Sequence, residues 1–327
     1  MSAPRITVIT PSYNQAGFLE KTIQSVLGQD YPDLEYFVID GGSTDGSQAV
    51  IERYAGRLAW WVSEKDRGQA DAVNKGLARA SGEIIGWVNS DDLYLPGALS
   101  GAAAAFDANP QAGLVFSNVR AIDENGDTTN LMRYGNWGLD DLMTFHIIGQ
   151  PGVFLRRSVL EKVGYLDLSY HYMLDHQLWL RMAQAAPMVY VDTVWAAARY
   201  HSSAKNIALA PRFGQDAYAI AHWMSGEPGL KEPYQRLERR VWAGAHRMNA
   251  RYMLDGGQNV EAIRCYWKSI LCYPPIGLSE AHRMVYAALS LVGMGWLKPV
   301  YLRLRRRIKG YSRSQPDSLA RKNSHPL

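Results

Sequence analysis

The feature that most constrains the fold is a regular alternation of strand-like and helix-like segments over the first 90 residues. Apolar runs rich in β-branched and aromatic residues lie at Ile6–Thr10, Tyr36–Asp40, Trp60–Ser63 and Ile84–Val88. Between them, apolar residues recur with the period of an amphipathic helix in the segments 14–29, 44–55 and 70–80. This order predicts an α/β fold with a Rossmann-like, mostly parallel sheet that helices cover on both faces.

Polar residues follow each of these predicted strands. They form the stretches Thr10-Pro11-Ser12-Tyr13, Asp40-Gly41-Gly42, Glu64–Gly68 and Asn89-Ser90-Asp91-Asp92. Ligands of open α/β sheets bind beyond the carboxyl ends of the strands. We therefore expect these stretches to line a ligand site.

The last of these stretches places two adjacent carboxylates, Asp91 and Asp92, after a buried strand. Like charges repel and are costly to desolvate, so a positive partner is expected there. Mg²⁺ prefers oxygen ligands and typically takes one or two carboxylates plus substrate phosphates. The alternative is a solvated turn in which Asp92 caps a following helix.

Four further candidates each have a structural alternative. Asp40, before two glycines, suits a hydrogen bond to a nucleotide base or ribose, or a tight polar turn. Asp66 and Gly68 precede a predicted helix, and Asn74 lies on it. These residues either form part of a ligand site or belong to the solvent-exposed face of that helix. Asp175, at a predicted helix start, is a general base or an acid favoured by the helix dipole. His201, beside two serines, is a ligand or a structural histidine.

The rest of the chain is less regular. Further strands are predicted at Leu114–Ser117, Val153–Leu155 and Met188–Val191. After residue 211 the sequence becomes helical and rich in Arg, Tyr and Trp. Neither G-x-G-x-x-G nor a Walker A sequence occurs in the chain.

Several of these motifs together resemble glycosyltransferase family 2, an inverting group with a GT-A fold, and in particular members that build bacterial surface polysaccharides. The resemblance covers about residues 4–206. It is carried by "ITPSYNQAGFLEKTIQSVLGQDYPDLEYFVIDGGSTDGS", "SEKDRGQADAVNKGLARASGEIIGWVNSDDLYLPGAL", "GQPGVFLRRSVLEKVGYLD" and "DHQLWLR". It implies a GT-A catalytic domain at 1–210, with a nucleotide-sugar half at 1–97 and an acceptor half at 98–210. A helical C-terminal region at 211–310 and a disordered tail at 311–327 would follow.

The resemblance also implies roles for individual residues. Asp91 and Asp92 correspond to the motif that holds Mn²⁺ or Mg²⁺ on the donor diphosphate, with Asn89 where the family commonly has its first acid. His201 would contact the metal or the diphosphate, Asp40 would read the base, and Asp175 would be the general base. The other implied donor contacts are Thr10, Pro11, Tyr13, Asp66, Gly68, Asn74, Asn89 and Ser90. The implied acceptor-side residues are Gln150, Pro151, Gly152 and Arg156.

The function so implied is a metal-dependent glycosyltransferase of the hexosyltransferase type. It would move a sugar from a nucleotide-sugar, expected to be a UDP-sugar, to a hydroxyl of a saccharide or lipid-linked acceptor. One alternative is a catalytically inactive nucleotide-sugar-binding subunit, which the departure at Asn89 favours. A second is a nucleotidyltransferase, but "TPSYNQAG" lacks the Gly/Arg-rich loop expected of one.

Charge and cysteine content bear on location and partners. The segment 298–322 carries a net charge of +8 against +4 for the whole chain, so the remainder is acidic. Residues 284–309 combine apolar and basic side chains and predict peripheral contact with the inner face of the cell membrane. Two cysteines and no N-terminal apolar leader favour a cytoplasmic protein. The acidic body and a tail without an aromatic platform argue against nucleic acid as a partner.

Overall fold

A nine-stranded sheet forms the centre of the computed structural model, which describes residues 3–201 and 210–297. Its strands are β1 (Ile6–Ser12), β2 (Leu34–Asp40), β3 (Trp60–Ser63), β4 (Ile84–Trp87), β5 (Leu93–Tyr94), β6 (Leu114–Ile122), β7 (Thr128–Met132), β8 (Val153–Arg156) and β9 (Met188–Arg199). They lie in the order β3-β2-β1-β4-β8-β6-β9-β5, with β7 beside β6.

The four N-terminal strands of this order, β3, β2, β1 and β4, are parallel. Their register sets Ser12 beside Asp40, and Asp40 beside Ser63. The carboxyl ends of these strands therefore meet at one edge of the sheet. Beyond β4, the strand β8 is antiparallel to both β4 and β6, whereas β9 is parallel to β6.

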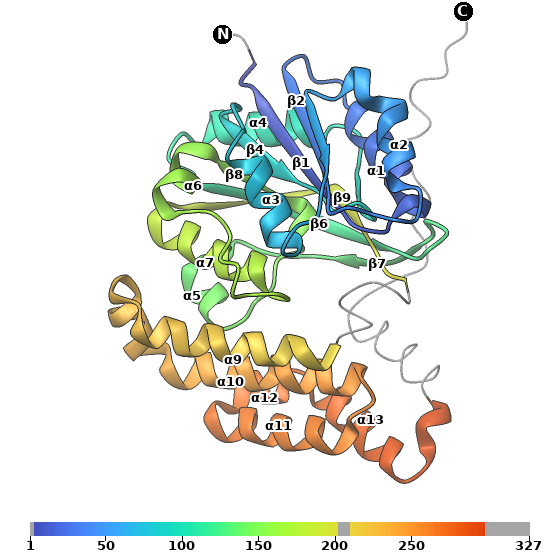
Figure 1. Ribbon diagram of the computed structural model, residues 1–327. Coiled ribbons are helices and arrows are strands. Elements are labelled where there is room, and N and C mark those ends of the chain that lie inside the picture. Colours follow the sequence, from blue (N-terminus) through green and yellow to red (C-terminus); the bar gives the residue numbers. More distant parts are fainter. Residues whose placement is uncertain (1–2, 202–209, 298–327) are drawn as a thin grey trace, which may run out of the picture.

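Helices cover both faces of the sheet (Figure 1). One face packs against α1 (Ala16–Leu27), α2 (Ser47–Tyr54) and α4 (Ala98–Ala108). The other packs against α3 (Gln69–Leu77), α5 (Leu139–Met143), α6 (Arg157–Val163) and α7 (Leu174–Ala185). Side chains of β2 show why: Tyr36 and Val38 join the first core, and Phe37 joins the second, as the two-residue period of a strand requires.

The C-terminal part is helical. It consists of α9 (Ala210–Gly226), α10 (Lys231–Asp255), α11 (Asn259–Cys272), α12 (Pro274–Leu278) and α13 (Ala281–Leu291). In Figure 1, α9 and α10 lie below α5 and α7, and buried residues of both helices extend the core on that face of the sheet. Within the described ranges, no helix is both long enough and apolar enough to cross a bilayer.

This α/β architecture with a helical C-terminal part confirms the predicted fold class. Most predicted strands are found within two residues, but β6 and β9 run several residues beyond the ends that the sequence suggested. The short strand β5 and the hairpin partner β7 were not predicted. The proposed tail at 311–327 and the basic segment 298–309 lie outside the described residues.

Candidate active site

One large cavity of about 1280 Å³ lies at the carboxyl ends of the parallel strands. Residues at or after the ends of β1, β2, β3 and β4 form one side of it. The opposite side comes from the segment between β7 and β8, the start of α7, and helices α10 and α13. Of the residues implied by the resemblance, the cavity lining includes Pro11, Tyr13, Asp66, Gly68, Asn89, Ser90, Asp91, Asp92, Gln150, Pro151 and Asp175.

Asp40 is placed differently from what the resemblance implied. Its side chain is fully buried and is absent from the cavity lining. Its carboxylate accepts hydrogen bonds from the backbone N–H of Gly42 and Ser43 at 3.1 and 2.9 Å. It also accepts from the hydroxyls of Ser43 and Ser63. Asp40 therefore shapes the loop after β2 through four bonds within the protein.

Thr10 is likewise buried, and its hydroxyl lies 3.0 Å from that of Tyr36 rather than in the cavity. Asn74 also acts within the protein: its side chain exchanges two hydrogen bonds with the backbone of Leu166, at 2.8 and 3.0 Å. These two residues link neighbouring elements of the fold, and neither lines the cavity.

The carboxylate of Asp66 occupies the space directly above Gly41. A Cβ atom added to Gly41 would lie 2.6 Å from Oδ2 of Asp66, so any side chain at position 41 would displace this carboxylate. The other oxygen, Oδ1, accepts a hydrogen bond of 2.8 Å from the N–H of Gly68. A glycine at position 41 is thus what allows an acid at position 66 to stand at this wall of the cavity.

Two residues that the sequence did not single out orient Asn89. Its Oδ1 atom accepts hydrogen bonds from Nε2 of Gln69 at 2.7 Å and from Nε1 of Trp87 at 2.9 Å. Its Nδ2 atom donates to Asp92 at 3.3 Å. An acid at position 89 could accept the first two bonds but could not donate the third while ionised. The hydrogen-bond partners around position 89 therefore favour the asparagine found here over the acid that the family commonly has.

The two adjacent carboxylates that follow β4 have different surroundings. Asp91 keeps 19% of its side chain exposed, and its Oδ2 lies 3.0 Å from Nε2 of His201. Asp92 is buried, and its Oδ1 accepts a hydrogen bond of 2.8 Å from the N–H of Arg199. Burial, together with the charge of Asp91, raises the pKa of Asp92.

Arg199, at the end of β9, brings a positive charge within electrostatic reach of Asp92, but its guanidinium bonds to backbone carbonyls rather than to the paired carboxylates. Its Nε donates to the carbonyl of Asp91 at 2.9 Å, and its Nη1 donates to the carbonyls of Asp123 and Glu124. The guanidinium also stacks on Phe18, whose ring packs against His201. The extension of β9 thus joins the Asp91 turn to His201 across 110 residues of sequence.

A divalent cation fits this edge of the cavity only if the substrate supplies ligands. In the ranges 3–201 and 210–297, no group of three or more His, Cys, Asp or Glu side chains could hold a metal ion. Asp91 lines the cavity, and Nε2 of His201, which is buried outside the lining, lies 3.0 Å behind its Oδ2, so the two offer neighbouring ligand atoms. Mg²⁺ is usually bound by one or two carboxylates and completed by substrate phosphates and water, so these residues fit that mode.

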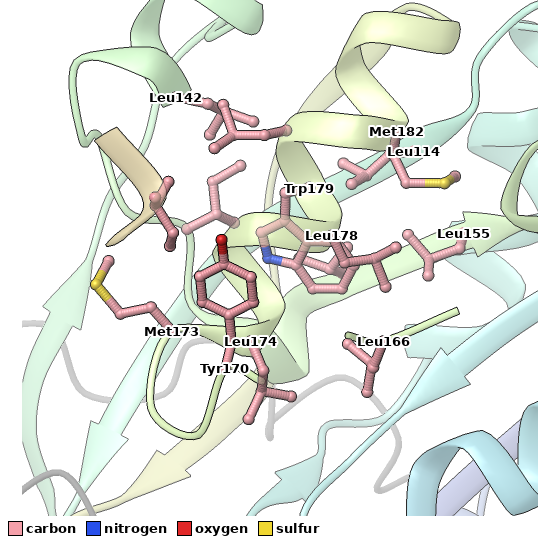
Figure 2. Packing of buried hydrophobic residues seen from close by; sticks show 14 of the residues in the cluster. Leu114, Leu142, Leu155, Leu166, Tyr170, Met173, Leu174, Leu178, Trp179 and Met182 are labelled. Carbon is pink, nitrogen blue, oxygen red and sulfur yellow. The ribbon is translucent and has the colours of Figure 1, made fainter. Parts of the chain in front are cut away.

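Asp175 lies in the first turn of α7 and lines the cavity from the other side. Figure 2 shows how the helix is held: Leu174, Leu178, Trp179 and Met182 of α7 pack among Leu114 of β6, Leu155 of β8 and Leu142 of α5. Asp175 is off this apolar face, as its position in the helical period predicted. The dipole of α7 favours a negative charge at this end of the helix.

The residue after Asp175 fixes the helix start. His176 is fully buried, and burial lowers its pKa to about 4, so the imidazole is neutral near pH 7. Its Nε2 lies 3.1 Å from the carbonyl of Leu142, which makes this nitrogen the donor. Its ring stacks on Phe145, a residue with a φ of 61° that bends the chain beside the cavity.

A second anchor comes from the helical C-terminal part. Oδ2 of Asp216, on α9, accepts hydrogen bonds from three consecutive backbone N–H groups. These belong to His171, Tyr172 and Met173, at 3.1, 2.8 and 3.1 Å. The turn that leads into Asp175 is therefore held by a carboxylate some 40 residues later. No pattern in the sequence indicated this contact, because Asp216 belongs to no recognisable motif.

The implied acceptor-side residues divide into two groups. Gln150 and Pro151 line the cavity, and Nε2 of Gln150 donates to the carbonyl of Trp87. Gly152 packs closely against Val119, and Arg156 donates to the carbonyl of Ala112 and stacks on Phe106. Gly152 and Arg156 are thus outside the cavity lining. The aromatic residues Tyr134, Trp137, Tyr172 and Tyr252 line this end instead.

Three comparisons with known proteins bear on this site. The family model described as "Glycosyl transferase family 2" matches residues 7–164. An uncharacterized glycosyltransferase of Mycobacterium tuberculosis (strain H37Rv) is 32% identical over 209 residues, which cover 59% of this chain and 74% of that protein. One of Rickettsia typhi is 25% identical over 209 residues, covering 62% of this chain and 65% of the relative.

Solved structures share the fold. Residues 1–349 of S. aureus TarS, in complex with UDP-GlcNAc, match with a TM-score of 0.57 and 18% identity, covering 85% of this chain and 91% of that one. The mannosyltransferase PcManGT of Pyrobaculum calidifontis, in complex with GDP-Man and Mn²⁺, matches with a TM-score of 0.61 and 21% identity, covering 95% of this chain and 85% of that one.

Proposed function

The chain belongs to glycosyltransferase family 2, with a GT-A fold, and from this premise we propose that it transfers a sugar from a nucleotide-sugar to an acceptor hydroxyl with inversion of the anomeric centre. The observation that carries the proposal is one cavity with Asp66 and Asp91 at the strand ends and Asp175 on the opposite side. His201 is buried outside the lining and contacts Asp91. Acids therefore lie on two opposite sides of the cavity. Those at the strand ends could hold a cation on the donor diphosphate, and Asp175 could accept a proton from the acceptor.

Asp91 and His201 would hold Mn²⁺ or Mg²⁺, and a cation bound there would offset the negative charge of the leaving diphosphate. Asp175 would accept the proton of the acceptor hydroxyl as its oxygen bonds to the anomeric carbon. The bond from that carbon to the diphosphate breaks in the same step, and the nucleoside diphosphate leaves. The aromatic rings of Tyr134 and Trp137 offer apolar faces for a sugar ring of the acceptor.

A screen of nucleotide-sugars tests this proposal. We expect one of UDP-GlcNAc, UDP-glucose and GDP-mannose, each with and without Mn²⁺, to raise the melting temperature and to be hydrolysed slowly to free sugar. A ligand at a hundred times its Kd stabilises a protein by about 2.7 kcal/mol. Stabilisation without any turnover would favour an inactive binding subunit. Release of pyrophosphate from a nucleoside triphosphate would favour a nucleotidyltransferase.

Asp66, rather than Asp40, is our candidate for the base contact, because its carboxylate stands at the cavity wall while that of Asp40 is bonded within the protein. We expect Gly41→Ala to displace the Asp66 carboxylate and to weaken donor binding roughly tenfold, the usual worth of a hydrogen bond to a charged group. The melting temperature should change little, because a side-chain end moves and the backbone does not.

The measurement is the Kd of the donor by titration calorimetry. Gly56→Ala is the matched control, since an added Cβ at Gly56 meets nothing within 4 Å. Unchanged donor affinity in Gly41→Ala would contradict the role given to Asp66.

Peripheral contact with the inner face of the cell membrane, through residues 284–309, completes the proposal. Large exposed apolar side chains concentrate toward this end, including Val285, Leu291, Val292 and Trp296. The relatives include the O-antigen biosynthesis protein RfbC of Myxococcus xanthus, of which this chain covers 15%. A lipid-linked saccharide acceptor would place the cavity near such a surface.

Flotation with anionic liposomes tests this contact. We expect the full chain to float at low salt and to be released as salt rises, because basic residues near an anionic surface add about 1 kcal/mol each and are screened by salt. The double variant Val292→Glu/Trp296→Glu should float less. Val260→Glu, also at an exposed apolar position of the helical part, is the control. Equal flotation of all three proteins would refute the assignment to this segment.

A further inference from the structure

The side of the cavity formed by α10 and α13 has an unusual charge arrangement. We call this side, consisting of Arg247, Met248, Arg251, Tyr252, Asp255, Glu280 and Arg283, the helical wall. Its two acids are already paired: Nη1 of Arg283 lies 3.3 Å from Asp255, and Nε of Arg283 lies 3.5 Å from Glu280. Tyr266 also donates to Glu280.

Arg247 and Arg251 are the remaining cations of the wall. Across the described ranges, neither forms an ion pair within 4 Å; the acids of the wall pair with Arg283 instead, although the charges of Glu280 and Asp255 still raise the pKa of Arg251. Nη2 of Arg247 donates to the carbonyl of Phe145 at 2.8 Å, while its Nε is buried without a hydrogen-bond partner in those ranges. Burial lowers the pKa of Arg247, and the acid that opposes this shift, Glu280, lies beyond ion-pair distance.

The spacing of the two arginines along α10 adds an unfavourable charge repulsion. Arg247 and Arg251 are four residues apart on α10, so their side chains lie on one face of the helix, where like charges repel. The guanidinium of Arg247, whose Nε is buried without a hydrogen-bond partner in the described ranges, is costly to keep there unless an anion faces it. Both side chains line the cavity, so a ligand is the group that can supply the negative charge.

The position of these arginines relative to Asp175 indicates whether they would bind the donor or the acceptor. Arg247 bonds to Phe145, whose ring stacks on His176, the residue next to Asp175. The hydroxyl of Tyr252 lies within electrostatic reach of both Arg251 and Asp175. The helical wall therefore adjoins the candidate base. Tyr200, which precedes His201, is also within electrostatic reach of Arg251 and Tyr252, so the wall extends toward the Asp91 edge as well.

Packing fixes α10 at this place. A Cβ added to Gly244 would lie 2.5 Å from the carbonyl oxygen of Thr144, so the helix approaches that segment as closely as a glycine allows. About two turns earlier in α10, Arg236 makes two hydrogen bonds to Asp140 of α5, at 2.7 and 2.9 Å. Arg247 and Arg251 thus line the cavity from a helix that is packed firmly against α5 and the segment that follows it.

We propose that Arg247 and Arg251 bind an oxyanion of the acceptor, a phosphate or a carboxylate close to the hydroxyl that receives the sugar. The planar guanidinium offers paired donors that match either group. The inference rests on the proposed function, because it takes Asp175 as the base that identifies the acceptor end. It specifies that function further, since neutral saccharides would then be poor acceptors.

Binding of three probes to the full chain, saturated with UDP and Mn²⁺, tests the inference. The probes are glucose, glucuronate and glucose 6-phosphate, measured by titration calorimetry at constant ionic strength. We expect at least one of the two anions to bind about tenfold or more tightly than glucose, as charge-assisted hydrogen bonds allow. The tighter of the two then distinguishes a phosphate from a carboxylate acceptor.

Arg247→Gln and Arg251→Gln should each reduce the preference for the anion, while Arg239→Gln, an exposed position on the same helix, should retain it. Arg247→Lys and Arg251→Lys keep the charge and should retain part of the preference, even if a Gln variant fails to fold. Equal binding of all three probes by the unmodified chain, or an unchanged preference in the folded variants, would overturn the inference.

Donor hydrolysis by the unmodified chain separates the two proposals. A chain that hydrolyses a nucleotide-sugar but shows no preference for an anion overturns the inference alone. A chain that prefers the anion but never turns over or binds a donor overturns the proposed function alone.

Discussion

Asp175→Asn is expected to lower the rate of sugar transfer by roughly 10²–10⁴-fold, the usual contribution of a positioned proton acceptor. The amide cannot take the proton of the acceptor hydroxyl, yet it preserves the size of the side chain. Oδ1 of Asp175 accepts the N–H of His176, and an asparagine oxygen can accept the same bond, so α7 should keep its start. Donor affinity should be unchanged, because the donor residues lie across the cavity.

Steady-state transfer rates and donor Kd values, measured on the same preparation, check this result. Asp167→Asn is a suitable control: Asp167 bonds to Ser169 in the loop before α7 and lies outside the cavity lining. A fall in donor affinity as large as the fall in rate would show that Asp175 belongs to the donor site and would refute its assignment as the base.

Asp91→Asn is expected to reduce turnover by roughly 10²–10³-fold or more and to remove the Mn²⁺-dependent part of nucleotide binding. Loss of the carboxylate leaves His201 as the single strong ligand at this edge. The fold should persist, because 19% of the Asp91 side chain is exposed and its backbone carbonyl still accepts the bond from Arg199.

Asp92→Asn separates the two adjacent acids. Asp92 is buried and bonds to the N–H of Arg199, so its replacement should lower the melting temperature while Mn²⁺ still strengthens nucleotide binding. Titration of UDP with and without Mn²⁺ on both variants is the measurement. Mn²⁺ dependence that survives in Asp91→Asn but is lost in Asp92→Asn would reverse the assignment.

The sheet and its ligand edge could be predicted because they depend on local patterns. The alternation of apolar strands and amphipathic helices fixes the class of fold, and polar residues at strand ends fix the edge where ligands bind. The sequence could not tell which of those polar residues face the cavity. Asp40 and Asp66 both follow strands, but the bonds from Gly42, Ser43 and Ser63 turn Asp40 inward.

Contacts made by the helical part were beyond prediction for a different reason. His201 was placed near the paired acids by resemblance to known motifs, whereas the helices after residue 211 match no such pattern. The roles of Gly244, Arg247 and Arg251 become apparent only in the tertiary structure, where α10 packs against Thr144 and Phe145. Surface arginines and cavity arginines look alike along a helix, and tertiary structure alone distinguishes them.

The bond from Asp216 to the turn before Asp175 bears on how such enzymes can be recombined. Every motif of the family resemblance ends before α9, so a fragment cut after residue 206 would look complete by sequence. That fragment would leave three consecutive N–H groups of residues 171–173 without their acceptor, directly before the candidate base. Chimaeras that exchange the helical part to change acceptor choice must therefore carry an acid at the position of Asp216, or the graft will disturb catalysis as well as specificity.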